Sequence, residues 1–244
     1  MPRSSESNLA PTRAGFGAIR RVDRACRVKR PRGLPVADFF LVRHGESLAN
    51  LDRRFDATLP GAPLSPRGLR QAELVADWFA ENRVRPSLIL TSPFTRTRQT
   101  ARPLHRRSGA ALLGADLLRE TAVGDWEGRS SRDMVDDPVY LAWRDDPEEA
   151  PPGGGERLSD VAARLTLLLA RLHRLAPDAA MTLFTHQHGL RAALSLTSSL
   201  RDAHGLLRPV PNCAIVHLRW WSEGPELVVL DQSIHELTRD VAAG

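Results

Sequence analysis

From residue 38 onward the sequence predicts an α/β fold with a mostly parallel central sheet. Two observations carry this prediction. Short apolar runs alternate along the chain with patterns of amphipathic helices, as expected for parallel strands joined by crossover helices. The first run, residues 39–42, has four apolar residues without a polar interruption, which suits a central strand covered by helices on both faces.

The expected elements follow this alternation in order. Ser65 and Pro66 supply an N-cap and a first-turn proline, which predict a helix after the first strand. We expect its sheet-facing side to carry Leu69, Ala72, Val75, Ala76 and Phe79.

Later helices are expected from about 92 to 107, from about 156 to 175, and at 189–199. Later strands are expected at 88–91, 111–113 and 181–185, with an antiparallel edge pair at 214–220 and 226–230. Between about 128 and 155, two Asp-Asp-Pro triplets and a Pro-Pro-Gly-Gly-Gly run break any long element. We expect this stretch to be an insertion of short helices that covers the site like a lid.

The positive charge is concentrated in the N-terminal segment. Residues 1–37 hold nine basic and two acidic residues, whereas the whole chain has a net charge of +5, so the remainder is slightly negative. We expect a disordered basic tail at 1–37, followed by one domain at 38–244. A polyanion-binding arm, an organellar transit-like peptide and a non-essential extension are the open roles for this tail. Since the domain has no positive balance, we do not expect nucleic acid as its partner.

The sequence favours a cytoplasmic location without a membrane partner. No apolar run reaches the roughly 18 residues of a membrane span. The segment 34–42 differs from a secretory signal, because Asp38 interrupts it and no small-residue cleavage pattern follows. Cys26 and Cys213 lie in unrelated contexts, which argues against a disulfide and fits a reducing compartment.

Charged and imidazole side chains follow four of the predicted strands. Arg43 and His44 come after the first strand, Arg96 after the second, Glu120 after the third and His186 after the fourth. Because the carboxyl ends of parallel strands meet at one edge, these residues are expected to converge there. Phosphoryl transfer needs such a set: cations and donors for the equatorial oxygens, a nucleophile, and an acid for the leaving oxygen.

These residues lie in ordered motifs. The first reads Leu-Val-Arg-His-Gly-Glu-Ser and Asn50 follows it; the motifs occupy 41–50, 63–72, 92–101, 118–128 with 155–156, and 185–191. Over about residues 38–235 the chain resembles the histidine phosphatase superfamily, in the branch of the phosphoglycerate mutase-like enzymes and small-molecule phosphatases (branch 1). The resemblance implies a three-layer α/β/α sandwich of the phosphoglycerate mutase-like kind.

The resemblance also implies a role for each residue, and neither a metal nor a cofactor. His44 would be the nucleophile that becomes phosphohistidine. A neutral imidazole attacks phosphorus only when an acceptor holds its other ring nitrogen, and the sequence does not identify that acceptor. Glu120 would protonate the leaving oxygen and then activate water. The phosphoryl oxygens would be bound by Arg43, Arg96, His186 and Asn50.

For two of these roles a rival residue lies nearby. Arg98 could bind phosphate in place of Arg96, and Asp125 or Glu127 could be the acid in place of Glu120. The register of the motifs favours Arg96 and Glu120.

Two motifs depart from the family pattern. The last reads His-Gln-His-Gly instead of His-Gly-Gly, so it offers two histidines. The strand end and the spacing to Arg191 favour His186 as the phosphate ligand, which leaves His188 as a contact for the leaving group. Arg54 is a further candidate substrate contact, although it begins Arg-Phe-Asp-Ala where the family commonly has Arg-x-Gln-Gly.

The sequence favours a phosphatase over a mutase. Mutases of this family carry basic segments after the acid glutamate and in the insertion, whereas here residues 121–123 read Thr-Ala-Val and 133–149 are acidic. We therefore predict a metal-independent phosphatase that hydrolyses small phosphomonoesters through a phosphohistidine. Phosphoglycerate mutase-type transfer is the nearest alternative, and a catalytically inactive phospho-ligand-binding protein is the alternative of another class. A homodimer is compatible with the sequence.

Overall fold

The computed structural model describes residues 35–146, 148–197, 210–222, 224–232, 234 and 238. The expected basic tail up to residue 34, Cys26 within it, and the end of the helix expected at 189–199 lie outside these residues. Within them, no helix has the length and apolar character to cross a membrane.

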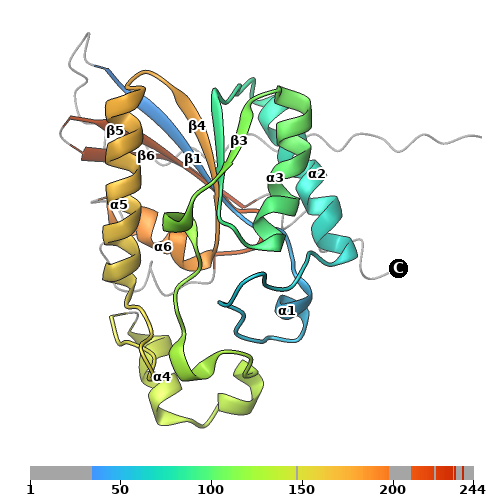
Figure 1. Ribbon diagram of the computed structural model, residues 1–244, viewed down its shortest axis with the longest axis vertical. Coiled ribbons are helices and arrows are strands. Elements are labelled where there is room, and N and C mark those ends of the chain that lie inside the picture. The colour runs from blue at the N-terminus through green and yellow to red at the C-terminus, as the bar shows by residue number, and fades with distance from the viewer. Residues whose placement is uncertain are drawn as a thin grey trace, which may run out of the picture.

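One six-stranded sheet forms the centre of the fold (Figure 1). Its order is β3-β2-β4-β1-β5-β6, with β1 parallel to β4, β4 parallel to β2, and β2 parallel to β3. The last two strands run antiparallel at one edge, as predicted. The strands are β1 (Ala37–Arg43), β2 (Leu88–Thr91), β3 (Ala111–Gly114), β4 (Ala180–Thr185), β5 (Ile215–Trp221) and β6 (Gly224–Asp231).

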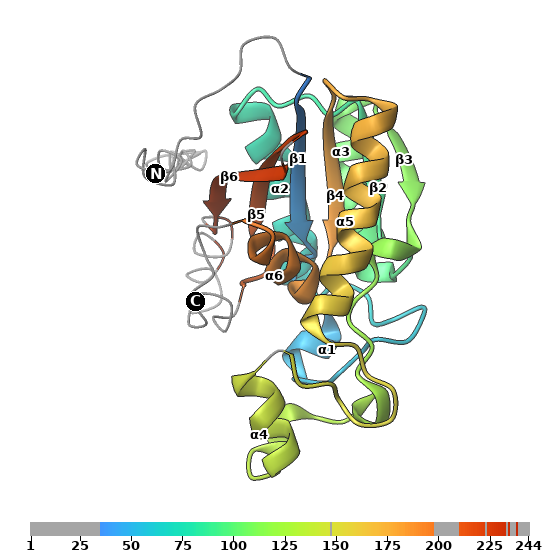
Figure 2. The same cartoon turned by 90° about the vertical axis from the view of Figure 1, so that its left-hand side faces the viewer.

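Helices cover both faces of the sheet, so the predicted three-layer sandwich is confirmed (Figure 2). Alternate residues of β1 point to opposite layers: Phe39 and Leu41 pack with α5 and α6, and Phe40 and Val42 pack with α2 and α3. The described helices are α1 (Leu48–Leu51), α2 (Pro66–Glu81), α3 (Thr95–Ser108), α4 (Pro138–Asp145), α5 (Leu158–Leu175) and α6 (Gln187–Ser195). Short 3₁₀ turns occupy Asp116–Leu118, Gly124–Trp126 and Ser131–Met134.

The buried face of α2 holds Ala72, Val75, Ala76 and Phe79 as predicted, but not Leu69. Leu69 is 50% exposed, while Gly68 and Gln71 lie on the buried side. The reason is a close approach of two backbones, because a Cβ on Gly68 would lie 2.0 Å from the carbonyl oxygen of Glu46. Gln71 accepts a hydrogen bond from the backbone of Glu46 at the same place.

Three helix starts also differ. α3 begins at Thr95 with Phe94 as its N-cap, and Ser92, at the expected start of this helix, contacts a histidine through its hydroxyl. α5 begins at Leu158, two residues later than expected, and α6 begins at Gln187.

The insertion lies beyond the carboxyl ends of the parallel strands, with α4 farthest from the sheet (Figures 1 and 2). It is built from short turns and α4, and we call residues 128–155 the lid segment. Its small apolar cluster holds Trp126 and Met134, with Phe55, Tyr140 and Trp143 packed against them. Trp126 is therefore a packing residue.

Candidate active site

The strand ends bring two histidines together. Arg43 pairs with Thr185 in the parallel β1–β4 register, so the residues that follow these strands are neighbours. The backbone N–H of His44 donates to the carbonyl oxygen of Thr185 at 3.0 Å. The rings of His44 and His186 lie 5.2 Å apart, centroid to centroid. The predicted convergence at one edge of the sheet is therefore present.

His44 is held as a neutral imidazole with one free ring nitrogen. Its Nδ1 lies 2.7 Å from the carbonyl oxygen of Gly45. A carbonyl oxygen only accepts, so Nδ1 carries the hydrogen and Nε2 keeps its lone pair. Burial, together with the charges of Arg96, His186 and Arg43, holds the pKa of His44 well below its usual 6.5. Gly45 is the acceptor that the sequence left unidentified.

The backbone around His44 is fixed from several sides. The N–H of Gly45 donates to Oγ1 of Thr100 at 3.0 Å, and the carbonyl oxygen of His44 accepts from Nδ2 of Asn212 at 3.0 Å. A Cβ on Gly45 would lie 2.7 Å from the carbonyl oxygen of Gly68. Glycine at this position is therefore required by the close approach of α2.

Arg43 lies in the buried base of the site. One of its terminal nitrogens, Nη1, donates to the carbonyl oxygen of Val210. Its Nε is buried and has no partner among the described residues. Burial lowers the pKa of Arg43 to about 10, although Glu120 and Cys213 act against this shift. The guanidinium is still a cation at neutral pH.

Arg96 is a second buried cation, and it is paired. Its Nη1 donates to Oδ2 of Asp56 at 2.8 Å and its Nη2 donates to the carbonyl oxygen of Asp56 at 2.8 Å. The guanidinium also lies 4.5 Å from the centre of the Phe94 ring. Burial lowers the pKa of Arg96, and the carboxylates of Asp56, Glu120 and Glu127 oppose this.

His186 has one ring nitrogen engaged and one available. Its Nε2 lies 2.8 Å from Oγ of Ser92, which explains why Ser92 does not cap α3. Its Nδ1 is buried without a partner among the described residues. Burial and the charge of Arg96 hold the pKa of His186 well below its usual value. A neutral imidazole with a single open nitrogen suits one hydrogen bond to a bound oxygen.

Glu120 is a buried carboxylate in contact with the second histidine of the last motif. Its Oε1 accepts from the backbone N–H of Thr121 at 2.9 Å and lies 3.3 Å from Nδ1 of His188. Burial alone would raise the pKa of Glu120, but the hydrogen bond and charge of His188, with His186 and the Thr121 N–H, hold it well below its usual value. Arg164 donates to the carbonyl oxygen of Glu120 at 3.4 Å.

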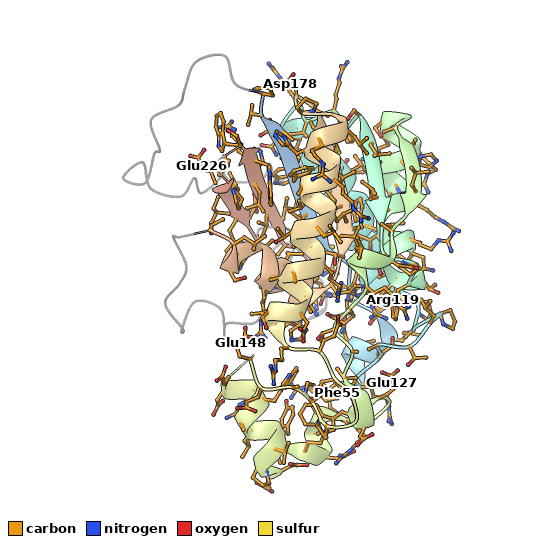
Figure 3. The ribbon with its side chains drawn as sticks, turned by 60° about the vertical axis from the view of Figure 1, so that its left-hand side comes forward. Phe55, Arg119, Glu127, Glu148, Asp178 and Glu226 are labelled. Atoms are coloured by element: carbon orange, nitrogen blue, oxygen red, sulfur yellow. The ribbon has the colours of Figure 1, made fainter. Side chains whose placement is uncertain are left out.

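Five of these groups, Arg43, His44, Arg96, Glu120 and His188, line one pocket of about 530 Å³. His186 is fully buried beside His44 and is not among the lining residues. The inner end of the pocket holds the residues after the strands. Its outer end is formed by the lid segment and by residues 53–57, and Figure 3 shows Phe55 and Glu127 between α4 and the sheet. The pocket is lined at its inner end by Arg43, His44, Asn50, Arg96, Glu120, His188 and Arg191, and at its outer end by Arg53, Arg54, Phe55, Tyr140, Trp143, Arg144 and Asp145.

The model of the histidine phosphatase superfamily (branch 1) matches residues 39–233. The chain belongs to the histidine phosphatase superfamily.

Two relatives and two solved structures illustrate the similarity of this histidine phosphatase to others. The glucosyl-3-phosphoglycerate phosphatase of Mycobacterium tuberculosis is 36% identical over 165 residues, 64% of this chain and 72% of the relative. The adenosylcobalamin/alpha-ribazole phosphatase of Escherichia coli is 31% identical over 150 residues, 61% of this chain and 72% of the relative.

A native structure of mycobacterial glucosyl-3-phosphoglycerate phosphatase matches with a TM-score of 0.69 and 31% identity, covering 80% of this chain and 98% of that one. Mycobacterial hydrolase 1 matches with a TM-score of 0.72 and 30% identity, covering 81% and 99%. The predicted superfamily, fold and enzyme class, a phosphatase, are confirmed.

The rival residues occupy different places in this histidine phosphatase. Arg98 is exposed on α3 and does not line the pocket, whereas Arg96 does. Glu127 accepts from the backbone N–H groups of Ala57 and Thr58, so it supports the loop beside the pocket. Asp125, like Glu127, is not among the lining residues.

The two remaining predicted substrate contacts, Asn50 and Arg54, already make hydrogen bonds within the protein. Oδ1 of Asn50 accepts from the N–H of Ser47 at 3.1 Å and from Nδ2 of Asn212 at 3.1 Å, so its amide nitrogen is the group it can offer. Nη1 of Arg54 donates to the carbonyl oxygen of Gly128 at 2.9 Å. Arg54 therefore ties the loop after α1 to the lid segment.

Sequence reasoning missed Asp56, Ser92 and the aromatic wall of the pocket. Asp56 lies in the motif that departs from the family pattern, and that departure could have indicated a specific role for it. Tyr140 and Trp143 are three residues apart in the lid segment, so one helical face carries both. That spacing could have indicated a common surface.

Proposed function

We propose that this phosphatase hydrolyses small phosphomonoesters whose leaving group carries a ring, either a sugar or a planar heterocycle. The phosphate would lie at the inner end of the pocket and the ring against the aromatic side chains at the outer end. The reaction would pass through a phosphohistidine at His44.

The chemistry requires no group beyond these side chains. The lone pair on Nε2 of His44 attacks phosphorus, the ester P–O bond breaks, and Glu120 gives a proton to the leaving oxygen. Glu120 then takes a proton from water as the water oxygen attacks phosphorus and the N–P bond breaks. Free phosphate leaves and His44 returns to its neutral form.

The negative charge on the phosphoryl oxygens would be stabilised by the cations Arg43 and Arg96 and by hydrogen bonds from His186 and Asn50. In a buried site, one such donor is worth about 3 to 4 kcal/mol of transition-state stabilisation. The main support for this proposal is the hydrogen bond from Nδ1 of His44 to the carbonyl oxygen of Gly45. It leaves Nε2 as a nucleophile beside two buried cations.

Two features support a ring in the leaving group. Phe55, Tyr140 and Trp143 are partly buried, pack against one another and line the outer end of the pocket. Aromatic faces of this kind bind the apolar face of a sugar or stack on a heterocycle. Relatives are named for glucosyl-3-phosphoglycerate and alpha-ribazole, which fits the same class.

A panel of phosphorylated metabolites tests this proposal. It should contain sugar phosphates, nucleotides and glycosylated phosphoglycerates beside acyclic esters such as glycerol phosphate, phosphoserine and phosphoglycerate. We expect higher kcat/KM for the ring-bearing group, and loss of that preference in W143A. Equal kcat/KM for both groups would refute the ring requirement.

The phosphohistidine is tested separately by trapping labelled enzyme in acid and in alkali. The label should be acid-labile and alkali-stable, and absent in H44A. Because one relative is a probable phosphoglycerate mutase of Photorhabdus laumondii, the panel includes a mutase assay. Mutase turnover above phosphatase turnover would favour that alternative.

A further inference from the structure

The carboxylate of Glu120 and the imidazole of His188 share one contact inside the pocket. Oε1 of Glu120 and Nδ1 of His188 are 3.3 Å apart, with side-chain exposures of 16% and 13%. An ionised carboxylate only accepts hydrogen bonds, so Nδ1 carries a hydrogen when Glu120 is charged. The reverse arrangement, a protonated Glu120 donating to Nδ1, holds the same single proton.

The carboxyl of Glu120 alone would hold that proton weakly. Positive groups face it from several elements and favour its ionised form. They lie on β1, after β2 and β4, on α5 and on α6. The lid segment adds one positive and one negative side chain at the pocket wall. The cations are Arg43, Arg96, Arg164 and Arg191, the two histidines beside Glu120 are His186 and His188, and the lid pair is Arg144 and Asp145.

His188 is placed to exchange a proton with Glu120. It is the second residue of the nine-residue helix α6, and its Nδ1 lies 3.3 Å from Oε1 of Glu120. From the lid, the ring of Trp143 lies 5.6 Å from that of His188 and covers it.

We propose that His188 and Glu120 act as one acid that shares a single proton. Building on the proposed function, the resting pair is His188 imidazolium and Glu120 carboxylate. As the P–O bond breaks, Glu120 gives the leaving oxygen a proton and takes one from Nδ1 of His188, which becomes neutral. When water attacks the phosphohistidine, its proton passes to Glu120 and back to His188, so the pair is restored.

Two substitutions at this position separate proton sharing from simple support. In H188N the amide nitrogen takes the place of Nδ1, so the hydrogen bond to Glu120 is kept without a proton that can be given up. In H188Q the amide reaches the position of Nε2, so the contact with Glu120 is lost as well. If the role is only orientation, H188N should behave as wild type.

The readout is kcat/KM, which reports the steps up to phosphoryl transfer to His44. It should be measured for an alkyl phosphate and for p-nitrophenyl phosphate, whose leaving group departs without a proton. We expect both variants to lose at least about tenfold on the alkyl phosphate, and no more than the 10²–10⁴ that a whole general acid supplies. Turnover of p-nitrophenyl phosphate should be nearly unchanged.

The pH profile gives a second readout. For the alkyl phosphate, the high-pH limb of kcat/KM should move to lower pH in H188N, because the acid is then the Glu120 carboxyl alone. Equal losses on both substrates, or wild-type behaviour of H188N, would overturn the proposal.

If neither variant folds, the wild-type enzyme still decides. Only the alkyl leaving group needs the shared proton. The same high-pH limb of kcat/KM for both substrates would therefore contradict the proposal. Failure of the proposed function itself is distinguishable, since H44A would then keep its activity or no phosphohistidine would be trapped from p-nitrophenyl phosphate.

Discussion

Asp56 and Arg96 form a mostly buried ion pair at the side of the phosphate end of the pocket. Oδ2 of Asp56 accepts from Nη1 of Arg96 at 2.8 Å and from the backbone N–H of Ala62 at 2.8 Å. Beside an arginine that we propose to bind phosphate, a carboxylate has two opposite effects. It fixes the direction of the guanidinium, and its charge repels the phosphate.

The first prediction separates these two effects. In D56N one side-chain oxygen can still accept from both Arg96 and Ala62, but the negative charge is gone. We expect D56N to keep most of the wild-type kcat and to bind inorganic phosphate more tightly as an inhibitor. D56A should lose about tenfold or more in kcat/KM, since removing the partner of a buried, hydrogen-bonded group costs about 1–3 kcal/mol.

Steady-state kinetics with phosphate inhibition measure both quantities. Wild-type kcat/KM in D56A would mean that Arg96 is oriented by other contacts, and unchanged phosphate inhibition in D56N would mean that the charge of Asp56 is not felt at the phosphate end.

The second prediction concerns stability and pH. The pKa values of His44 and His186 in the folded protein lie well below 6.5. Below about pH 6.5 the unfolded chain therefore binds more protons than the folded one, so the free energy of unfolding falls as pH decreases. Each histidine contributes a slope of up to about 1.4 kcal/mol per pH unit.

Urea unfolding between pH 8 and 5 tests this slope. H44N keeps a side-chain donor for the carbonyl oxygen of Gly45 and removes the titration, so its unfolding free energy should depend less steeply on pH. Parallel curves for H44N and wild type would show that His44 does not titrate in this way.

The third prediction concerns the backbone contact beside His44, the proposed nucleophile. A Cβ at Gly45 meets the carbonyl oxygen of Gly68 at 2.7 Å, and two backbones cannot move apart without moving α2. We expect G45A to lower the free energy of unfolding by about 1–3 kcal/mol, as overpacking does. It should also lower kcat, because the acceptor of Nδ1 of His44 is displaced.

A matched control lies on β3, where a Cβ at Gly114 would have no heavy atom within 4 Å. G114A should leave both the unfolding free energy and kcat close to wild type. If G45A matched G114A in both, the contact with Gly68 would not be restrictive.

The sequence contained enough to predict the sheet and the group of residues at its edge. The uninterrupted run 39–42 is a buried central strand, and Arg43, His44 and His186 follow strands whose carboxyl ends are adjacent. This part is predictable because strand burial and the parallel arrangement are encoded in local apolar patterns.

Contacts between particular atoms were not predictable from the sequence. Gly45 as acceptor for His44 depends on a ring rotation, and the pairing of Asp56 with Arg96 joins residues forty positions apart. The helical recurrence of apolar residues predicts Leu69 on the same face of α2 as Ala72 and Phe79, yet Leu69 is half exposed. Its exposure follows from Gly68, whose missing side chain allows a backbone contact that no apolar pattern records.

The fourth prediction decides which arginine of α3 serves the reaction. Arg96 lines the pocket and is buried, whereas Arg98, two residues further along the same helix, is exposed and does not line it. R96A removes a cation at the phosphate end and also leaves the mostly buried carboxylate of Asp56 unpaired. We expect kcat to fall by roughly 10²–10³, the usual loss for one donor to developing charge.

R96K keeps the charge, but a single ammonium cannot bind Oδ2 and the backbone carbonyl oxygen of Asp56 and also present a planar pair of donors to phosphate. Most of the loss in R96A should therefore persist in R96K. R98A is the matched control and should stay close to wild type in kcat, KM and thermal stability. A loss in R98A as large as that in R96A would reverse the assignment and place the second phosphate-binding arginine on the exposed side of α3.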